Sequence, residues 1–259
     1  MSAEKARALV IRLADFSESS RVVTLFSREF GQLSCLAKGA KRLRNPFESA
    51  LDLLSECHIV FLRKSSGALH LLTEAQLIRR FSPAPQESLG LYGGYYIAEL
   101  LEAFTAADDP HTELYDTAVA ALADLDAPQG GQPAGSPDHR LTILRFELAL
   151  LRETGQLPEF THCLVCGLPI DAAPAGRIWV SQGGLLCSNC GRPEFDHTNI
   201  SPGTLAVVRR LAAAEIPRQW LSRLQLTAEQ WLELRRLVTQ LICQTLGKRP
   251  KLLAYLRFR

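Results

Sequence analysis

Four cysteines constrain the fold of this chain more than any other feature. They are spaced C-x2-C-x20-C-x2-C, at Cys163, Cys166, Cys187 and Cys190. Each pair brackets a tight turn that aims two thiolates at one point, so two such turns complete a tetrahedral Zn²⁺ site. Two disulfides, or four unrelated buried thiols, are the alternatives. Because four cysteine ligands leave no position open for water, we predict one structural Zn²⁺ rather than a catalytic one.

The other three cysteines and the first residues indicate the compartment. Cys35, Cys57 and Cys243 stand alone in apolar or alternating surroundings, which is typical of core positions. The polar beginning of the chain does not resemble a signal peptide, and no apolar run reaches the ~18 residues of a membrane span. We therefore expect a cytoplasmic protein with no membrane association, and reducing cytosol favours metal over disulfide.

Charge is distributed unevenly along the 259 residues. The net charge of +2 combines +5 in residues 1–80, −10 in residues 81–160 and +7 in residues 161–259. Basic ends around an acidic middle indicate a polyanion-binding surface built from the termini. A charge layout that only aids solubility is the alternative. With 47% hydrophobic residues, the chain can bury a sizeable core over two or three domains.

The first eighty residues have the composition of short β-strands. Val, Ile and Leu are concentrated in five segments, which are 7–13, 21–27, 33–37, 51–63 and 68–78. Five short antiparallel strands predict a small closed barrel, for which we expect an OB-fold. On strand count alone, an SH3-like barrel is the competing prediction.

Helical spacing replaces strand spacing after residue 83. Apolar residues recur every three or four positions in Leu89–Phe104, Leu114–Leu125 and Leu141–Glu153. Ser201 followed by Pro202 predicts one more helix start, and Thr227 with Gln230 predicts a capping box on the last long helix.

These patterns together predict an α+β multidomain fold. A helical bundle at the C-terminal side would carry an inserted zinc-ribbon-like module. The predicted parts are an OB-fold domain at 1–80, a first helical part at 81–157, the four-cysteine zinc module at 158–200 and a second helical part at 201–259.

A cluster of positive charge follows the third predicted strand, in the segment 38–44. Its side chains would neutralise phosphates without reading base sequence. The predicted DNA contacts are Lys38, Lys41, Arg42 and Arg44, with Arg21 beside them. The basic segment Lys248, Arg249 and Lys251 is a second candidate, and a merely solvated loop is the alternative. Phe16 and Phe47 lie in loops and are candidates for stacking on bases.

Catalytic patterns are weak. The tripeptide His111-Thr112-Glu113 matches the H-x-E of zinc deaminases, but the proline before the cysteines is missing and four thiolates would saturate the metal. The sequence has no G-x-x-x-x-G-K-[ST] phosphate loop and no G-x-S-x-G nucleophile turn. His162 and His197 flank the zinc module and could replace a ligand, although hydrogen-bonded roles are expected. We therefore expect a protein that is not an enzyme.

Several short segments resemble one known family in the same order along essentially the whole chain. They are Asp15–Phe26, Phe30–Leu33, Ala37–Arg42, Arg145–Leu148, Leu150–Gly155, Ser181–Cys190 and Leu246–Pro250. This set resembles the bacterial RecO recombination and repair proteins.

The resemblance implies a non-enzymatic mediator. Such proteins bind single- and double-stranded DNA and anneal complementary strands. With RecR, and in some bacteria RecF, they help RecA replace single-strand-binding protein during recombinational repair of DNA damage, the RecFOR pathway. The resemblance therefore also implies that the protein is associated with the nucleoid in the cytoplasm. A zinc-ribbon RNA-binding or translation-associated protein and a purely protein-binding adaptor are the rival functions.

The resemblance also implies that the helical domain captures the acidic, phenylalanine-ended tail of single-strand-binding protein (SSB). That peptide needs an apolar pocket and a cation for its carboxylate. Arg145, with Arg140 nearby, is the candidate cation, and Leu141, Leu144 and Leu148 could line the pocket. The alternative is that Arg145 pairs with acids on a neighbouring helix.

Overall fold

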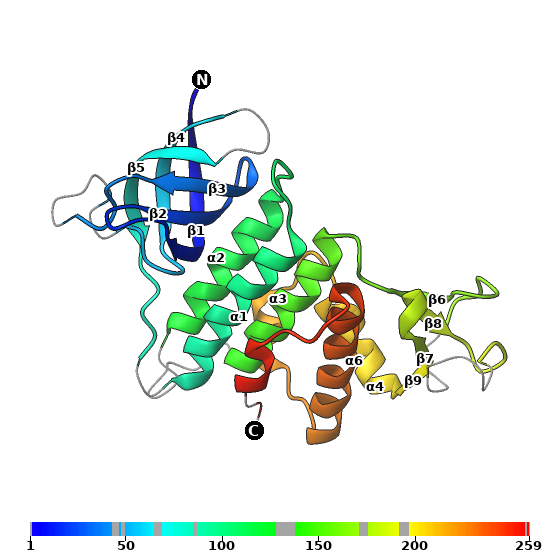
Figure 1. Ribbon diagram of the computed structural model, residues 1–259. Coiled ribbons are helices and arrows are strands. Elements are labelled where there is room, and N and C mark those ends of the chain that lie inside the picture. The colour runs from blue at the N-terminus through cyan, green and yellow to red at the C-terminus, as the bar shows by residue number, and fades with distance from the viewer. Residues whose placement is uncertain are drawn as a thin grey trace. The chain divides into compact units, whose positions relative to one another are not determined.

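Strands fill most of the first eighty residues and helices are the main elements of the remainder, which makes the fold α+β (Figure 1). This computed structural model describes residues 2–42, 47, 50–64, 69–84, 87–127, 138–170, 176–191, 197–256 and 258. The chain divides into two compact units. Unit 1 comprises residues 1–133 and 250–259, and unit 2 comprises residues 134–249.

Unit 1 begins with a sheet in which the last strand of the hydrogen-bonded order pairs with the first. Its strands are β1 (Ala3–Asp15), β2 (Arg21–Ser27), β3 (Gly31–Ala37), β4 (Glu56–Leu62) and β5 (His70–Arg79). They pair in the order β1-β2-β3-β5-β4, and β4 pairs back with β1. The β3–β5 pair is parallel and the other pairs are antiparallel. The first strand is longer than predicted because its polar start, Ala3–Lys5, also pairs with β4.

Alternating side chains build the core of this sheet. In β3, Leu33, Cys35 and Ala37 are buried, while Ser34 between them is exposed, as expected for a strand with one face inward. Cys35 and Cys57 are fully buried, which confirms their predicted core role, and burial raises the pKa of each thiol to about 12. Phe47 is also in this core.

The helices of unit 1 are α1 (Ser88–Phe104) and α2 (Thr112–Asp126), with a short 3₁₀ helix η2 (Leu252–Tyr255). Helices α1 and α2 pack on each other, and α1 also contacts β1 and η2. The Glu99 carboxylate of α1 accepts hydrogen bonds from the backbone N–H groups of Lys251 and Leu252, at 2.7 and 2.9 Å. The rings of Tyr92 and Tyr255 stack with their centroids 5.2 Å apart.

Unit 2 contains four helices in its described part, α3 (His139–Glu153), α4 (Pro202–Leu211), α5 (Arg218–Arg223) and α6 (Ala228–Leu246). Both α3 and α4 pack on α6. The predicted starts are confirmed, because Ser201 caps α4 and Thr227 and Gln230 form the capping box of α6. Gly247 ends α6 at a φ of 66°, a conformation that glycine adopts without strain. Among the residues with described positions, no helix is long and apolar enough to cross a membrane.

A second, four-stranded sheet lies within unit 2. Its strands are β6 (Glu159–Cys163), β7 (Gly176–Trp179), β8 (Gly184–Leu186) and β9 (His197–Ile200), in the order β6-β8-β7-β9. β7 and β8 pair antiparallel across the 3₁₀ helix η1 (Val180–Gln182) and so form a hairpin. This sheet carries the two cysteine pairs.

Candidate metal centre and nucleic-acid interface

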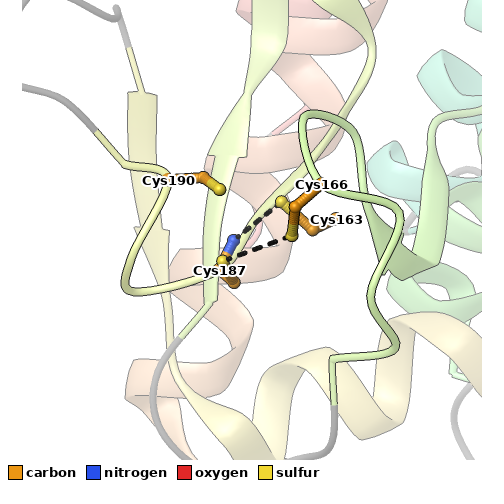
Figure 2. Close-up of side chains that lie close together, drawn as sticks. All are labelled: Cys163, Cys166, Cys187 and Cys190. Atoms are coloured by element: carbon orange, nitrogen blue, oxygen red, sulfur yellow. Dashed lines mark hydrogen bonds between the residues drawn. The ribbon is translucent and has the colours of Figure 1, made fainter.

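Two turns bring the four predicted cysteines together (Figure 2). Cys163 ends β6 and Cys166 lies in the turn that follows, while Cys187 and Cys190 come from the turn after β8. All four sulfur atoms lie within 4.8 Å of one another, and the Cys166 and Cys187 sulfurs are 3.9 Å apart. Sulfurs bound to one tetrahedral Zn²⁺ are about 3.8 Å apart, given Zn–S bonds of ~2.3 Å. All seven cysteines of the chain are free thiols, so the disulfide alternative is not observed.

Backbone hydrogen bonds shape each turn around its sulfurs. The Gly167 N–H donates to the Cys163 carbonyl at 2.8 Å, and the φ of Gly167 is 70°, where a side chain would be strained. The Gly191 N–H donates to the Cys187 carbonyl at 3.1 Å in the same way. The Cys187 N–H also points at the Cys163 sulfur, at 3.4 Å (Figure 2).

The electrostatics of the cluster suit a cation. Burial alone would raise the pKa of Cys163, but backbone N–H groups from Cys166, Cys187 and Val165 lower it to about 6. Cys190 shows the opposite shift, since its hydrogen bond to Cys187, burial and the neighbouring sulfurs raise its pKa to about 12. Neighbouring thiolates repel each other, so the loss of a proton from one thiol opposes its loss from the next. A divalent cation among the four sulfurs would remove this conflict. The four cysteines could therefore hold a metal ion.

Arginines from outside the turns fix this module in place. Arg209 of α4 donates through Nε to the Phe160 carbonyl and through a terminal nitrogen to the Ile170 carbonyl, both at 2.6 Å. Arg177 of β7 donates to the Gly191 carbonyl at 3.0 Å. Neither arginine was predicted from the sequence. The residues around an arginine do not show whether its side chain will bind backbone carbonyls of another segment or extend into solvent.

The predicted phosphate-contacting residues lie where two loops of unit 1 meet. The Lys41 N–H donates to the Ser19 carbonyl at 3.1 Å, which joins the loop after β3 to the loop between β1 and β2. Lys38 and Arg42 are exposed in the first loop, and Arg21 is half-buried at the start of β2. Arg44 lies outside the described residues. The structure therefore brings together four of the five predicted cations.

One acid in this region was not predicted from the sequence. The Asp15 carboxylate accepts a hydrogen bond from Lys41 Nζ at 3.0 Å and from Arg21 Nε at 3.3 Å. The Lys41 hydrogen bond, followed by its charge and that of Arg21, holds the pKa of Asp15 below its usual range. A single acid between two strand patterns gives no sequence signal, because the partners lie 6 and 26 positions away.

The two loop phenylalanines differ in exposure. Phe16 follows Asp15 directly and is 61% exposed, so it remains a candidate for stacking on a base. Phe47 is 1% exposed within the core of the closed sheet. The prediction that Phe47 stacks on bases is therefore wrong, because its side chain fills the sheet interior.

The remaining predicted residues are placed as follows. Lys248, Arg249 and Lys251 are exposed beyond the end of α6. On α3, Arg140 pairs with Asp138 and lies over the Trp231 ring, 5.0 Å from its centroid. Arg145 is half-buried on the same helix, and its neighbours Leu141, Leu144 and Leu148 are 6%, 1% and 0% exposed. The SSB-tail site at Arg140 and Arg145 stays a prediction.

These features define a class of protein, an α+β chain with a closed strand order, a cationic loop and a built-in cysteine module. Comparison with known proteins makes the assignment more specific. The family model described as Recombination protein O N terminal matches residues 1–81, and Recombination protein O C terminal matches residues 86–254. The chain belongs to the RecO family.

Named relatives agree with that assignment. The chain is 40% identical over 213 residues to "DNA repair protein RecO" of Rhodopirellula baltica, covering 81% of this chain and 76% of the relative. It is 31% identical over 255 residues to "DNA repair protein RecO" of Anaeromyxobacter dehalogenans, covering 96% of this chain and 94% of that relative.

Proposed function

We propose that this protein is a non-enzymatic DNA-binding mediator of recombinational DNA repair. It would bind single- and double-stranded DNA, anneal complementary strands and help load RecA on DNA coated with SSB. Family membership and the names of the relatives support a role in DNA repair, and they do not favour the RNA-binding alternative. The observation that supports DNA binding is the set of cations carried where the two loops meet, which includes the exposed Lys38 and Arg42.

The closed sheet would supply the DNA-binding domain, residues 1–80, as an OB-fold. Its strand order, with a parallel β3–β5 pair among antiparallel ones, supports a five-stranded Greek-key barrel over a simple meander. OB-folds bind single strands by combining a positive groove with exposed aromatic side chains. Lys38, Lys41 and Arg42 would contact phosphates, with Arg21 and Arg44, and Phe16 would stack on a base.

Replacement of loop cations tests this assignment. The double variant Lys38→Ala with Arg42→Ala leaves the Lys41–Asp15 pair in place. It should weaken binding to all DNA sequences about equally and flatten the slope of log affinity against log salt by ~1.4 on single strands, because two fewer counterions are released. Fluorescence anisotropy with single-stranded, duplex and structured-RNA probes measures this.

The matched control is Lys5→Ala with Lys64→Ala, which removes two exposed cations of unit 1 outside the two loops. Its slope should change much less. An unchanged slope in the loop variant would move the site to Lys248, Arg249 and Lys251. Tighter binding to structured RNA than to either DNA would support the RNA-binding alternative instead.

The mediator role needs a second assay because DNA binding alone does not define it. The wild-type protein should speed annealing of complementary strands, including strands covered by SSB. It should shorten the lag before RecA filaments form. This effect is measured with RecR present, and in a parallel mixture that contains both RecR and RecF. Tight DNA binding without faster annealing would contradict the mediator role and favour a protein-binding adaptor.

We propose that the cysteine module, within residues 158–200 between helical segments 81–157 and 201–259, holds one structural Zn²⁺. The ligands would be Cys163, Cys166, Cys187 and Cys190, and the bound metal would stabilise the two turns. Elemental analysis of purified protein should give one zinc per chain. Loss of zinc on replacing Cys187 by Ser, but not on replacing the buried Cys35, would identify the ligand set.

We also propose that α3 captures the SSB tail through Arg145, assisted by Arg140. Calorimetric titration of the tail peptide should show weaker binding to Arg145→Ala than to wild type. Because the three neighbouring leucines are buried, the peptide ring would need a pocket formed by other side chains. Equal affinities in the folded variant would remove Arg145 from the site.

A further inference from the structure

Two of the proposed phosphate-binding cations are already engaged inside the protein. Lys41 Nζ donates to Asp15 at 3.0 Å and to the Ser17 carbonyl at 3.2 Å, and its side chain is 26% exposed. Arg21 Nε donates to the other oxygen of the same carboxylate, at 3.3 Å. The Asp15 carboxylate itself is 66% exposed.

A carboxylate between two cations offers them the same kind of acceptor as a DNA phosphate. Both groups are anionic oxygens that take charge-assisted hydrogen bonds from Lys and Arg. Lys41 and Arg21 therefore cannot give all their donors to DNA while they hold Asp15. The Asp15–Lys41 pair also lies where the loop after β3 meets the loop between β1 and β2, beside the exposed residue Phe16.

We propose that Asp15 is a built-in competitor of the DNA phosphate, which lowers the affinity and the salt dependence of DNA binding. This inference rests on the proposed DNA site. On binding, a phosphate displaces the carboxylate from Lys41, and on release the carboxylate takes the lysine back. The protein thereby holds DNA less tightly than its cations would allow, which suits a protein that hands a strand on.

Charge and contact can be separated experimentally because a second acid, Glu18, lies in the loop that follows Asp15. Glu18 is exposed and forms no ion pair within the part of the chain that the structure describes. Asp15→Asn and Glu18→Gln each remove one negative charge from this region of unit 1. Only Asp15→Asn removes a charge that Lys41 and Arg21 contact directly, which weakens their hold on this side chain, so the two variants remove the same charge but differ in contact.

The experiment measures affinity for an oligo-dT single strand by anisotropy, at salt concentrations from about 0.1 to about 1 M. For Asp15→Asn we expect a slope steeper than that of wild type by about 0.7 for each cation released, since more phosphates are neutralised. If the affinities are similar at the high-salt end, one released cation corresponds to about fivefold tighter binding at the low-salt end. Glu18→Gln should show less than half of this gain, because an unpaired charge acts only through the screened field.

A Lys41→Gln background tests whether Asp15 acts through Lys41. In that background, the share of the gain that comes through Lys41 should disappear, so Asp15→Asn should steepen the slope by no more than the ~0.7 that Arg21 contributes. Equal gains in Asp15→Asn and Glu18→Gln, or weaker binding by Asp15→Asn, would overturn the inference while leaving DNA binding intact. Absence of DNA binding by wild type at low salt would overturn the proposed function, and the competitor role with it. Asp15→Ser, checked like Asp15→Asn for an unchanged melting curve, provides the second variant.

Discussion

Gly31 illustrates how strongly a single residue can constrain unit 1. Its φ is 67°, and a Cβ there would lie 2.2 Å from the Asp109 carbonyl oxygen, which is closer than atoms can approach. Gly31→Ala should therefore destabilise unit 1 by about 2–4 kcal/mol, from backbone strain and the clash together.

The control is Gly39→Ala in the same unit. Its φ is 75°, but the nearest atom to an added Cβ is Arg42 Cδ at 3.6 Å, an ordinary contact. Strain alone should cost about 1 kcal/mol there. Urea unfolding followed by tyrosine absorbance compares the two, and equal losses would show that the close approach of Asp109 does not matter.

A buried ion pair in unit 2 gives a second residue-level prediction. Arg235 of α6 donates two hydrogen bonds of 2.6 Å to the carboxylate of Glu147 on α3, which is fully buried. Arg235→Met would deprive the buried carboxylate of this counter-charge and should cost about 3–5 kcal/mol. Urea unfolding followed by tryptophan fluorescence measures the loss.

The matched double variant removes both charges. Glu147→Leu with Arg235→Met should recover most of the stability, because no uncompensated charge stays buried. A double variant as unstable as Arg235→Met alone would mean that the space between α3 and α6 requires the polar pair.

Single residues also show where prediction from sequence succeeds. The cysteine spacing predicted the convergence of four sulfurs, because each turn has only two residues between its thiols. Loop position did not predict the burial of Phe47, since a loop side chain can turn inward. Asp15 and Arg209 could not be found, because each acts through partners that are distant in sequence.

At the scale of elements, helices and helix caps with strong local sequence signals were predicted, and elements with weak signals were not. The predicted helices correspond to α1, α2 and α3 within a few residues, and the caps of α4 and α6 were predicted at the residues that form them. The short strands β6 and β9 and the six-residue helix α5 were not predicted. Such short elements depend on neighbouring strands and helices, and the parallel β6–β8 pairing has a register shift that no local pattern announces.

The clamp between α4 and the cysteine module supports a prediction about metal release. Arg209→Met removes both 2.6 Å hydrogen bonds to the backbone on either side of the first cysteine pair. The turn should open more often, so a chelator should extract zinc several times faster than from wild type. A colorimetric chelator measures the rate.

Arg210→Met is the control for that experiment. Arg210 is the next residue of α4 and lies over the Trp220 ring, 5.9 Å from its centroid, instead of contacting the module. Its extraction rate should stay near that of wild type. Equal acceleration in both variants would attribute the effect to the helix and not to the clamp.

At the scale of the whole molecule, the two units can be followed separately by their own chromophores. All three tryptophans, Trp179, Trp220 and Trp231, belong to unit 2, and all five tyrosines belong to unit 1. Removing the proposed zinc should lower the melting temperature seen by tryptophan fluorescence, because metal binding and folding of such a module are coupled. Tyrosine absorbance and DNA binding should change little, and re-addition of Zn²⁺ should restore the tryptophan signal. Equal shifts in both chromophores would show that the units unfold together.

The sequence could predict the classes of the elements but not all their partners. Helical periodicity shows that α1 has a buried side, yet it does not show that this side contacts β1 and η2. The return of residues 250–259 to the first unit has no local signal either, since the contacts join positions 152 and 153 residues apart.

That return has a consequence for how the protein is made in the cell. A ribosome completes all of unit 2 before it adds Lys251, Leu252 and Tyr255, whose contacts with Glu99 and Tyr92 finish unit 1. At translation rates of about 5–20 residues per second, the surface on α1 waits roughly 8 to 30 seconds for this segment. Unit 1 therefore stays incomplete until residues 250–259 have been made, and the nascent chain carries an open helix surface throughout that interval.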